Sequence, residues 1–167
     1  MKETGCLFKE LVDPRLLAII VTHHCTSACK SCCFNCSPTV STMLSYDMMI
    51  DIIDSSVKQF PGLKVLVLTG GEVLSLDINI IKNVLSYAKG KGLSTRIVSN
   101  GFWASNITKT YQILNELVDS GLDEVNLSTG DEHLKFVPLE NILNVAICAE
   151  KIDSLKTCLI VVEKGLN

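Results

Sequence analysis

Five short apolar runs recur along the chain, separated by amphipathic segments. The runs are rich in β-branched residues and mostly continuous rather than alternating, which is typical of parallel strands covered on both faces. They occupy residues 16–21, 64–69, 95–99, 124–128 and 157–162. Apolar residues at three- and four-residue spacing predict helices over 48–57, 78–88, 107–118 and 139–152. Lys89-Gly90 is expected to end the second helix through a glycine cap, and Gly121 to close the third.

The spacing of the strands predicts the architecture. The last four strands recur at intervals of about 30 residues, as βα units with tight loops do, whereas the first interval is nearer ~48. A series of parallel crossovers forms either an open doubly wound sheet or part of a barrel, and both place ligands at the carboxyl ends of the strands. The residues that follow each strand are therefore the candidates for a site.

Length and composition are those of one globular domain. The chain has 167 residues, 47% of them apolar, which is enough to build a core. A net charge of −3 without a long Lys/Arg block argues against binding to nucleic acid or to an anionic membrane surface. The apolar run after the charged N-terminal segment is only about six residues long, too short for a signal sequence or a membrane span. We therefore expect a cytoplasmic protein.

Five of the eight cysteines crowd into one stretch, His23 to Pro38. Cytosolic thiols stay reduced, so such a cluster more often holds metal or does chemistry than forms disulfides. Two C-x2-C pairs adjoin directly, whereas zinc ribbons separate their pairs by about a dozen residues or more. A bacterial ferredoxin spacing also fails, at the first gap and at the proline. What remains is a C-x3-C-x2-C loop whose three thiolates would leave one iron of a four-iron cube open, as a catalytic metal centre requires. Its cysteines are Cys25, Cys29 and Cys32.

Two motifs together carry a family resemblance. Cys25-Thr-Ser-Ala-Cys29-Lys-Ser-Cys32 after the first strand, with Gly70-Gly71-Glu72 after the second, resembles the radical S-adenosylmethionine (SAM) superfamily. The resemblance implies an α/β partial TIM-type barrel and a 4Fe-4S cluster whose open iron is chelated by SAM. It implies reductive cleavage of SAM to a 5′-deoxyadenosyl radical that abstracts hydrogen from an unknown substrate. It also implies a one-electron donor such as flavodoxin or ferredoxin, while the protein positions and shields the cofactors.

The resemblance further implies contacts to SAM. Gly70 and Gly71 would let the backbone approach the SAM ammonium group, and Glu72 would add negative charge. A Cβ at Gly71 is therefore expected to weaken SAM binding without touching the cluster. An ordinary glycine turn is the alternative. Polar residues at the ends of the third and fourth strands complete the implied contacts, namely Ser99, Asn100 and Ser128.

Several residues keep open roles. Cys33 and Cys36 are not expected to be cluster ligands, and a redox or second-metal role is their alternative. Asp131 and His133 could face the substrate. Three further cysteines are expected to be structural or incidental: Cys6, Cys148 and Cys158.

Two questions stay open at this stage. A non-catalytic iron-sulfur or zinc protein, or an inactive fragment of a longer enzyme, is the alternative to a radical SAM enzyme. The fifth strand, residues 157–162, is apolar throughout but would lie at an open sheet edge. Because the family's core has six βα units, residues 1–167 are expected to be one radical SAM core domain that lacks the sixth. A partner chain or a further C-terminal segment would complete the barrel.

Overall fold

A computed structural model of the chain describes residues 13–164. It contains one parallel sheet with the strand order β1-β2-β3-β4-β5. The strands are β1 (Leu16–Thr22), β2 (Val65–Gly70), β3 (Ser94–Ser99), β4 (Glu124–Gly130) and β5 (Thr157–Glu163). All five predicted strands are present, and the sequential order is that of a partial barrel. Cys6 lies outside the described residues.

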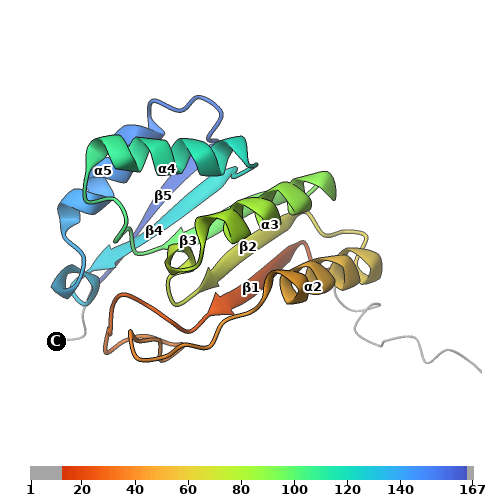
Figure 1. Cartoon of the computed structure of the whole chain (residues 1–167), viewed down its shortest axis with the longest axis horizontal. Coiled ribbons are helices and arrows are strands. Elements are labelled where there is room, and N and C mark those ends of the chain that lie inside the picture. The colour runs from red at the N-terminus through yellow and green to blue at the C-terminus, as the bar shows by residue number, and fades with distance from the viewer. Residues whose placement is uncertain (1–12, 165–167) are drawn as a thin grey trace, which may run out of the picture.

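A helix follows each of the first four strands, and the helices lie along one face of the sheet (Figure 1). They are α2 (Tyr46–Gln59), α3 (Ile78–Gly90), α4 (Ile107–Asp119) and α5 (Leu139–Ala149), with short 3-10 turns η1 (Val73–Ser75) and η2 (His133–Lys135). The predicted β-α alternation is therefore confirmed. Within residues 13–164, no helix has the length and apolarity needed to cross a membrane.

Several predicted helix ends differ from the structure by one to three residues, and two of them have a clear physical reason. Gly90 is still helical, and the positive φ of +79° that stops α3 belongs to Gly92. A glycine is needed there because the chain must enter the left-handed region after the cap residue, Lys91. Helix α5 ends at Ala149 rather than Ile152, since the amide groups of Lys151 and Ile152 bond three residues back instead of four.

The hydrophobic core lies between the sheet and its helices. Along β3 and β4, buried residues alternate with half-buried ones, so only the face toward the helices is fully packed. The half-buried face carries polar groups, including the ion pair of Arg96 with Glu124. Coverage of both faces, expected from the apolar runs, is therefore not seen in these two strands. The largest fully buried core side chains include Ile53, Leu66, Leu68, Leu85, Ile97, Leu114, Leu127 and Ile142.

Strand β5 forms an edge of the sheet, as expected. It pairs with β4 along its whole length, and its apolar side chains are largely exposed, with Val162 at 72%. The expectation that another chain segment pairs with this edge stays a prediction.

The amino ends of the strands are joined by ion pairs around Asp123. Its carboxylate lies 2.9 Å from Lys89 Nζ and 2.7 Å from Lys156 Nζ, and it accepts a hydrogen bond from the Thr95 backbone. Burial opposes this charge, but the hydrogen bonds from the two lysines and the Thr95 amide, with the charge of Lys89, together outweigh it and lower the pKa of Asp123. These contacts stabilise the end of the sheet at which the strands begin. In βα folds of this type, the functional site lies at the opposite end, where the strands finish.

Candidate functional site

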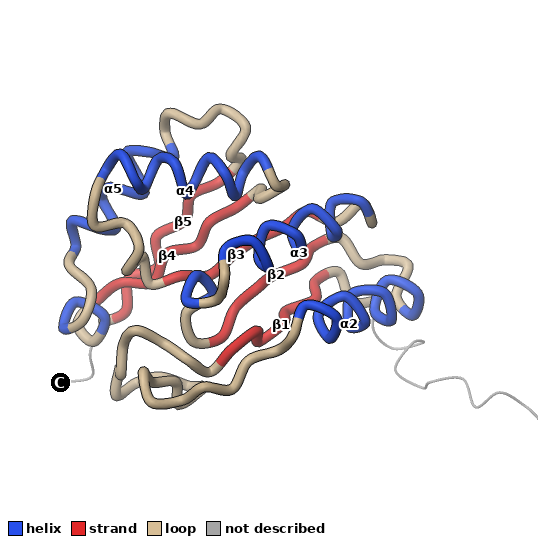
Figure 2. Tube along the Cα trace, viewed as in Figure 1, coloured by secondary structure: helices blue, strands red, loops and turns tan. Residues whose placement is uncertain are grey.

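The carboxyl ends of the strands surround a cavity of about 270 Å³. The long loop after β1 lies at this end of the sheet, as Figure 2 shows. Eight of the nine residues predicted for cofactors line the cavity: Cys25, Cys29, Cys32, Gly70, Gly71, Ser99, Asn100 and Ser128. Glu72 is the exception. Four neighbours whose roles were left open or unassigned also line it: Cys33, Cys36, His133 and Glu163. Residues far apart in the sequence thus meet at one site.

The cysteine loop is held together at its base by backbone hydrogen bonds. The amide of Leu44 donates to Val21 O at 2.9 Å, and the amide of Cys25 donates to Ser37 O at 3.2 Å. The ring Nδ1 of His24 lies 2.9 Å from Val40 O and joins the two arms of the loop. These hydrogen bonds give the loop a defined shape.

Two of the predicted ligand thiols receive hydrogen bonds from backbone amides. Ser27 N lies 3.4 Å from Cys25 Sγ, and Cys36 N lies 3.3 Å from Cys32 Sγ. Such donors stabilise a thiolate and tune an iron-sulfur cluster. Burial, together with neighbouring thiols and carboxylates, raises the pKa of Cys25 and of Cys29. The free thiols are therefore protonated near neutral pH, and metal binding must release their protons.

The three predicted ligands line the same cavity, and Cys25 and Cys32 are near enough to raise the pKa of Cys29. Among residues 13–164, no three His, Cys, Asp or Glu side chains are placed to hold a single metal ion. A mononuclear zinc site needs its ligands around one centre, whereas the thiolates of a four-iron cluster each bind a separate iron. Three thiol donors at one cavity fit a cluster by their chemistry, since cysteine thiolates are its usual ligands.

The second cysteine pair lies in the same loop. Cys36 is buried, and burial together with its contact to the Cys32 thiol raises the pKa of Cys36 to about 12. Cys33 is exposed at the cavity. That neither is a cluster ligand stays a prediction. Cys148 and Cys158 are not among the cavity-lining residues, and Cys148 is buried in α5 with its thiol 3.5 Å from Ile107 O.

The glycines after β2 meet the cysteine loop itself. Gly71 N donates to Thr22 O at 2.7 Å, and Glu72 N donates to His24 O at 2.8 Å. A Cβ built on Gly71 would lie 2.6 Å from the carbonyl carbon of His24 and closer still to its oxygen. His24 directly precedes Cys25. A side chain at Gly71 would displace the backbone that carries the first ligand, which argues against the expectation that it spares the cluster; that expectation stays a prediction.

Glu72 lies behind the cavity wall and is fully buried. Its carboxylate accepts hydrogen bonds from Asn100 N at 2.7 Å, Ser99 Oγ at 2.9 Å and Leu74 N at 3.0 Å. Burial outweighs these bonds and raises the pKa of Glu72 to about 7. Glu72 thus joins the ends of β2 and β3, and its expected contact with the SAM ammonium group stays a prediction.

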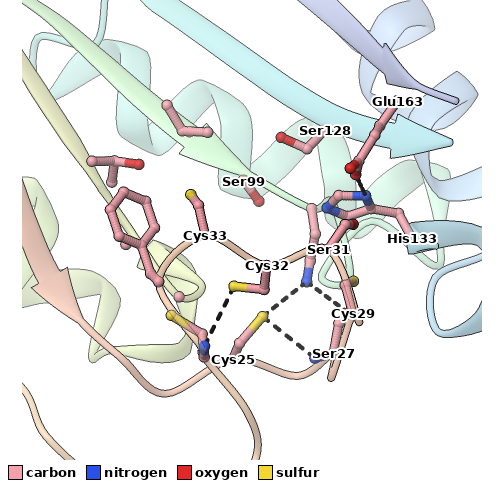
Figure 3. A pocket seen from close by; sticks show the side chains of 17 residues that line it. Cys25, Ser27, Cys29, Ser31, Cys32, Cys33, Ser99, Ser128, His133 and Glu163 are labelled. Carbon is pink, nitrogen blue, oxygen red and sulfur yellow. Dashed lines mark hydrogen bonds and ion pairs between the residues drawn. The ribbon is translucent and has the colours of Figure 1, made fainter. Parts of the chain in front are cut away.

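The wall on the Cys29 side comes from the chain after β4 and from the end of β5, and Lys30 N of the cysteine loop donates to Glu132 Oε2 there at 3.2 Å. His133 Nδ1 lies 3.6 Å from Glu163 Oε2, and Figure 3 shows this pair across the cavity from Cys25 and Cys32. Asp131, also considered for the substrate side, is not among the lining residues. Sequence analysis did not single out Glu163, although a carboxylate directly after the fifth apolar run was an available signal.

Comparison with known proteins gives the family. The model of the radical SAM superfamily matches residues 19–137. The putative peptide biosynthesis protein YydG of Bacillus subtilis (strain 168) is 25% identical over 131 residues, covering 78% of this chain and 40% of that protein. The trans-4-hydroxy-L-proline dehydratase activating enzyme of Clostridioides difficile is 33% identical over 86 residues, covering 50% of this chain and 28% of the enzyme. The chain therefore spans well under half the length of these relatives.

A solved structure, native anSMEcpe with bound AdoMet and Cp18Cys peptide, has a TM-score of 0.64 to this chain. The alignment covers 87% of this chain and 42% of the solved chain, at 12% identity. The likeness therefore concerns the fold alone. The matched residues 19–137 include the cysteine loop, the Gly70-Gly71-Glu72 turn and the ends of β3 and β4. The chain belongs to the radical SAM superfamily, a family that implies a 4Fe-4S cluster and SAM as cofactors.

Proposed function

We propose that this chain binds a 4Fe-4S cluster through Cys25, Cys29 and Cys32 and acts with SAM as a radical enzyme on a substrate C–H bond. The observation that carries the proposal is that these three cysteines line one cavity with the ends of β2, β3 and β4. When bound, the cluster and SAM supply reductive cleavage of SAM to a 5′-deoxyadenosyl radical. The chain spans only 40% of YydG and 28% of the activating enzyme. Catalytic activity of the whole protein is therefore part of what we propose.

The chain's own residues divide the cavity into two sides. On the cysteine side, the thiols would hold the cluster, and the amides of Ser27 and Cys36 would stabilise two of the ligand sulfurs. The strand ends beside them would provide the wall for SAM through Gly70, Gly71, Ser99, Asn100 and Ser128.

The remaining wall would serve the substrate and exclude water. His133 and Glu163 face the cysteines and offer a hydrogen-bonding pair to a bound molecule. Val98 and Phe34 add apolar groups to the lining, and a radical reaction needs such groups to keep water away.

The reaction also needs an electron from outside the cavity. A flavodoxin or ferredoxin is the proposed donor, since the family generally requires a reductant. The described cysteines are all free thiols, so a reducing compartment such as the cytosol would keep the ligands available.

Anaerobic reconstitution of the 167-residue chain with iron and sulfide tests the proposal. We expect about four irons per chain, as a 4Fe-4S cluster requires. After chemical reduction, we expect 5′-deoxyadenosine to form from SAM. Cys25→Ala should lose both the iron and the product, and Cys33→Ala serves as the matched control that keeps both.

The outcomes separate the alternatives. A protein that binds zinc or a single iron would refute the cluster. A protein that holds the cluster but forms no 5′-deoxyadenosine would support the non-catalytic alternative. Loss of iron from the Cys33→Ala variant but not from Cys25→Ala would show that the ligand set is wrong.

A further inference from the structure

Asn100 connects the end of β3 to the cysteine loop. The residue is only 5% exposed, and its Nδ2 lies 3.0 Å from Thr26 Oγ1, 3.2 Å from Ser27 Oγ and 3.7 Å from Cys25 Sγ. Its Oδ1 accepts a hydrogen bond from Phe102 N at 3.0 Å. An amide nitrogen cannot accept that bond, so the donor face of Asn100 must point at the cysteine loop.

The backbone of Asn100 is fixed from behind by a buried carboxylate. Glu72 accepts the amide of Asn100 at 2.7 Å, and it accepts the hydroxyl of the preceding Ser99 at 2.9 Å. A continuous set of buried hydrogen bonds thus runs from the end of β2, through the end of β3, to the first ligand of the loop. Because each member is partnered, the set is rigid.

We propose that Asn100 is a positioning residue for the iron-sulfur cluster. Its side-chain amide holds residues 25–27 in the shape that binds iron. In the protein that carries the cluster, the same amide donates an N–H···S hydrogen bond to Cys25 Sγ. The inference rests on the proposed function. The role in the cysteine loop is additional to the SAM contact that the family resemblance implies for Asn100.

Two physical consequences follow. A loop that is already ordered loses less conformational entropy when iron binds, so the cluster is held more tightly. An N–H donor to a cluster sulfur favours the more negative, reduced state, so it raises the reduction potential. Loss of the donor should therefore release iron faster and make the cluster harder to reduce.

Asn100→Asp is the main test, because it keeps the size and replaces the donor group with an acceptor. The control is Asn141→Ala. Asn141 is 6% exposed and donates to the carbonyl groups of Gly101 and Phe102 at 3.1 and 3.2 Å, so it supports the same turn without touching the cysteine loop. Each protein is reconstituted anaerobically without SAM. Iron release to a chelator and the midpoint potential by electron paramagnetic resonance are then measured.

We expect Asn100→Asp to release iron about tenfold faster or more, the usual size for loss of an outer-shell hydrogen bond to a metal site. Its midpoint potential should shift to a more negative value. Asn141→Ala should keep the wild-type release rate and potential while lowering the urea midpoint. Wild-type behaviour in Asn100→Asp, or equal effects in both variants, would overturn the inference.

A second variant decides the matter when Asn100→Asp does not fold. Thr26→Val with Ser27→Ala removes two partners on the loop side and leaves Asn100 intact. Faster iron release is expected again, and a wild-type rate would overturn the inference. A wild-type chain that forms no cluster would refute the proposed function and this inference together. A normal wild-type cluster with unaffected variants would refute the inference alone.

Discussion

The contact between Gly71 and the cysteine loop leads to a prediction about Gly71→Ala. The new Cβ would lie 2.6 Å from the carbonyl carbon of His24 and 3.0 Å from that of His23. Both are backbone atoms, so they cannot rotate away as the end of a side chain could. The substitution must push the start of the cysteine loop away from β2.

The cost can be worked from the contacts that are lost. Overpacking against a rigid neighbour typically costs about 1–3 kcal/mol. The displacement also weakens the bonds of Gly71 N to Thr22 O and Glu72 N to His24 O, each worth about 1 kcal/mol. We expect a loss of about 3 kcal/mol in the free energy of unfolding, which lowers Tm by roughly 6–12 °C in a domain of this size. Because Cys25 follows His24, iron binding should fall as well.

Urea unfolding under anaerobic, reducing conditions measures the stability, and iron per chain after reconstitution measures the site. Gly90→Ala is the matched control, since a Cβ on Gly90 meets no atom within 4 Å. Gly90 lies in the last turn of α3, so alanine there should leave stability equal or slightly higher. A Gly71→Ala protein with the urea midpoint and iron content of the wild type would refute the reasoning.

Three further predictions concern other parts of the fold. Alanine at any one of the three predicted ligands should abolish the cluster, whereas alanine at Cys33 or Cys36 should not, as iron analysis will show. Burial raises the pKa of Glu72 from 4.5 to about 7, so the stability that its protonated form contributes is complete below about pH 4.5 and is lost as the pH rises through 7. Glu72→Gln should therefore remove about 3 kcal/mol of the fall in the free energy of unfolding over that window. Urea unfolding at several pH values measures it, and an unchanged pH slope would contradict the prediction. Asp123→Ala leaves the buried Thr95 amide and two lysines without their partner, so it should cost about 2 kcal/mol of stability with normal iron content.

Local pattern was sufficient to predict the strands and helices, and it was sufficient to propose three cysteines as metal ligands. Apolar runs and helical periodicity place the strands and helices, because the spacing of apolar residues along an element shows which of its faces is buried. The C-x3-C-x2-C spacing and the Gly70-Gly71-Glu72 turn are contiguous, so both can be seen without knowing the fold. The shared end of the parallel strands then predicts that they meet.

Tertiary structure decided which atoms those motifs contact. Periodicity does not reveal partners across a sheet, because strand register and loop path determine them. The register irregularity between Ile20 and Thr22 places Thr22 opposite Gly70 and brings the cysteine loop onto Gly71. Glu72 meets Asn100 across 28 residues, and Asn100 meets Cys25 across 75. Pairings at such distances exist only once the strands have paired into the sheet, and so only the tertiary structure shows that the Glu72 carboxylate joins the ends of β2 and β3.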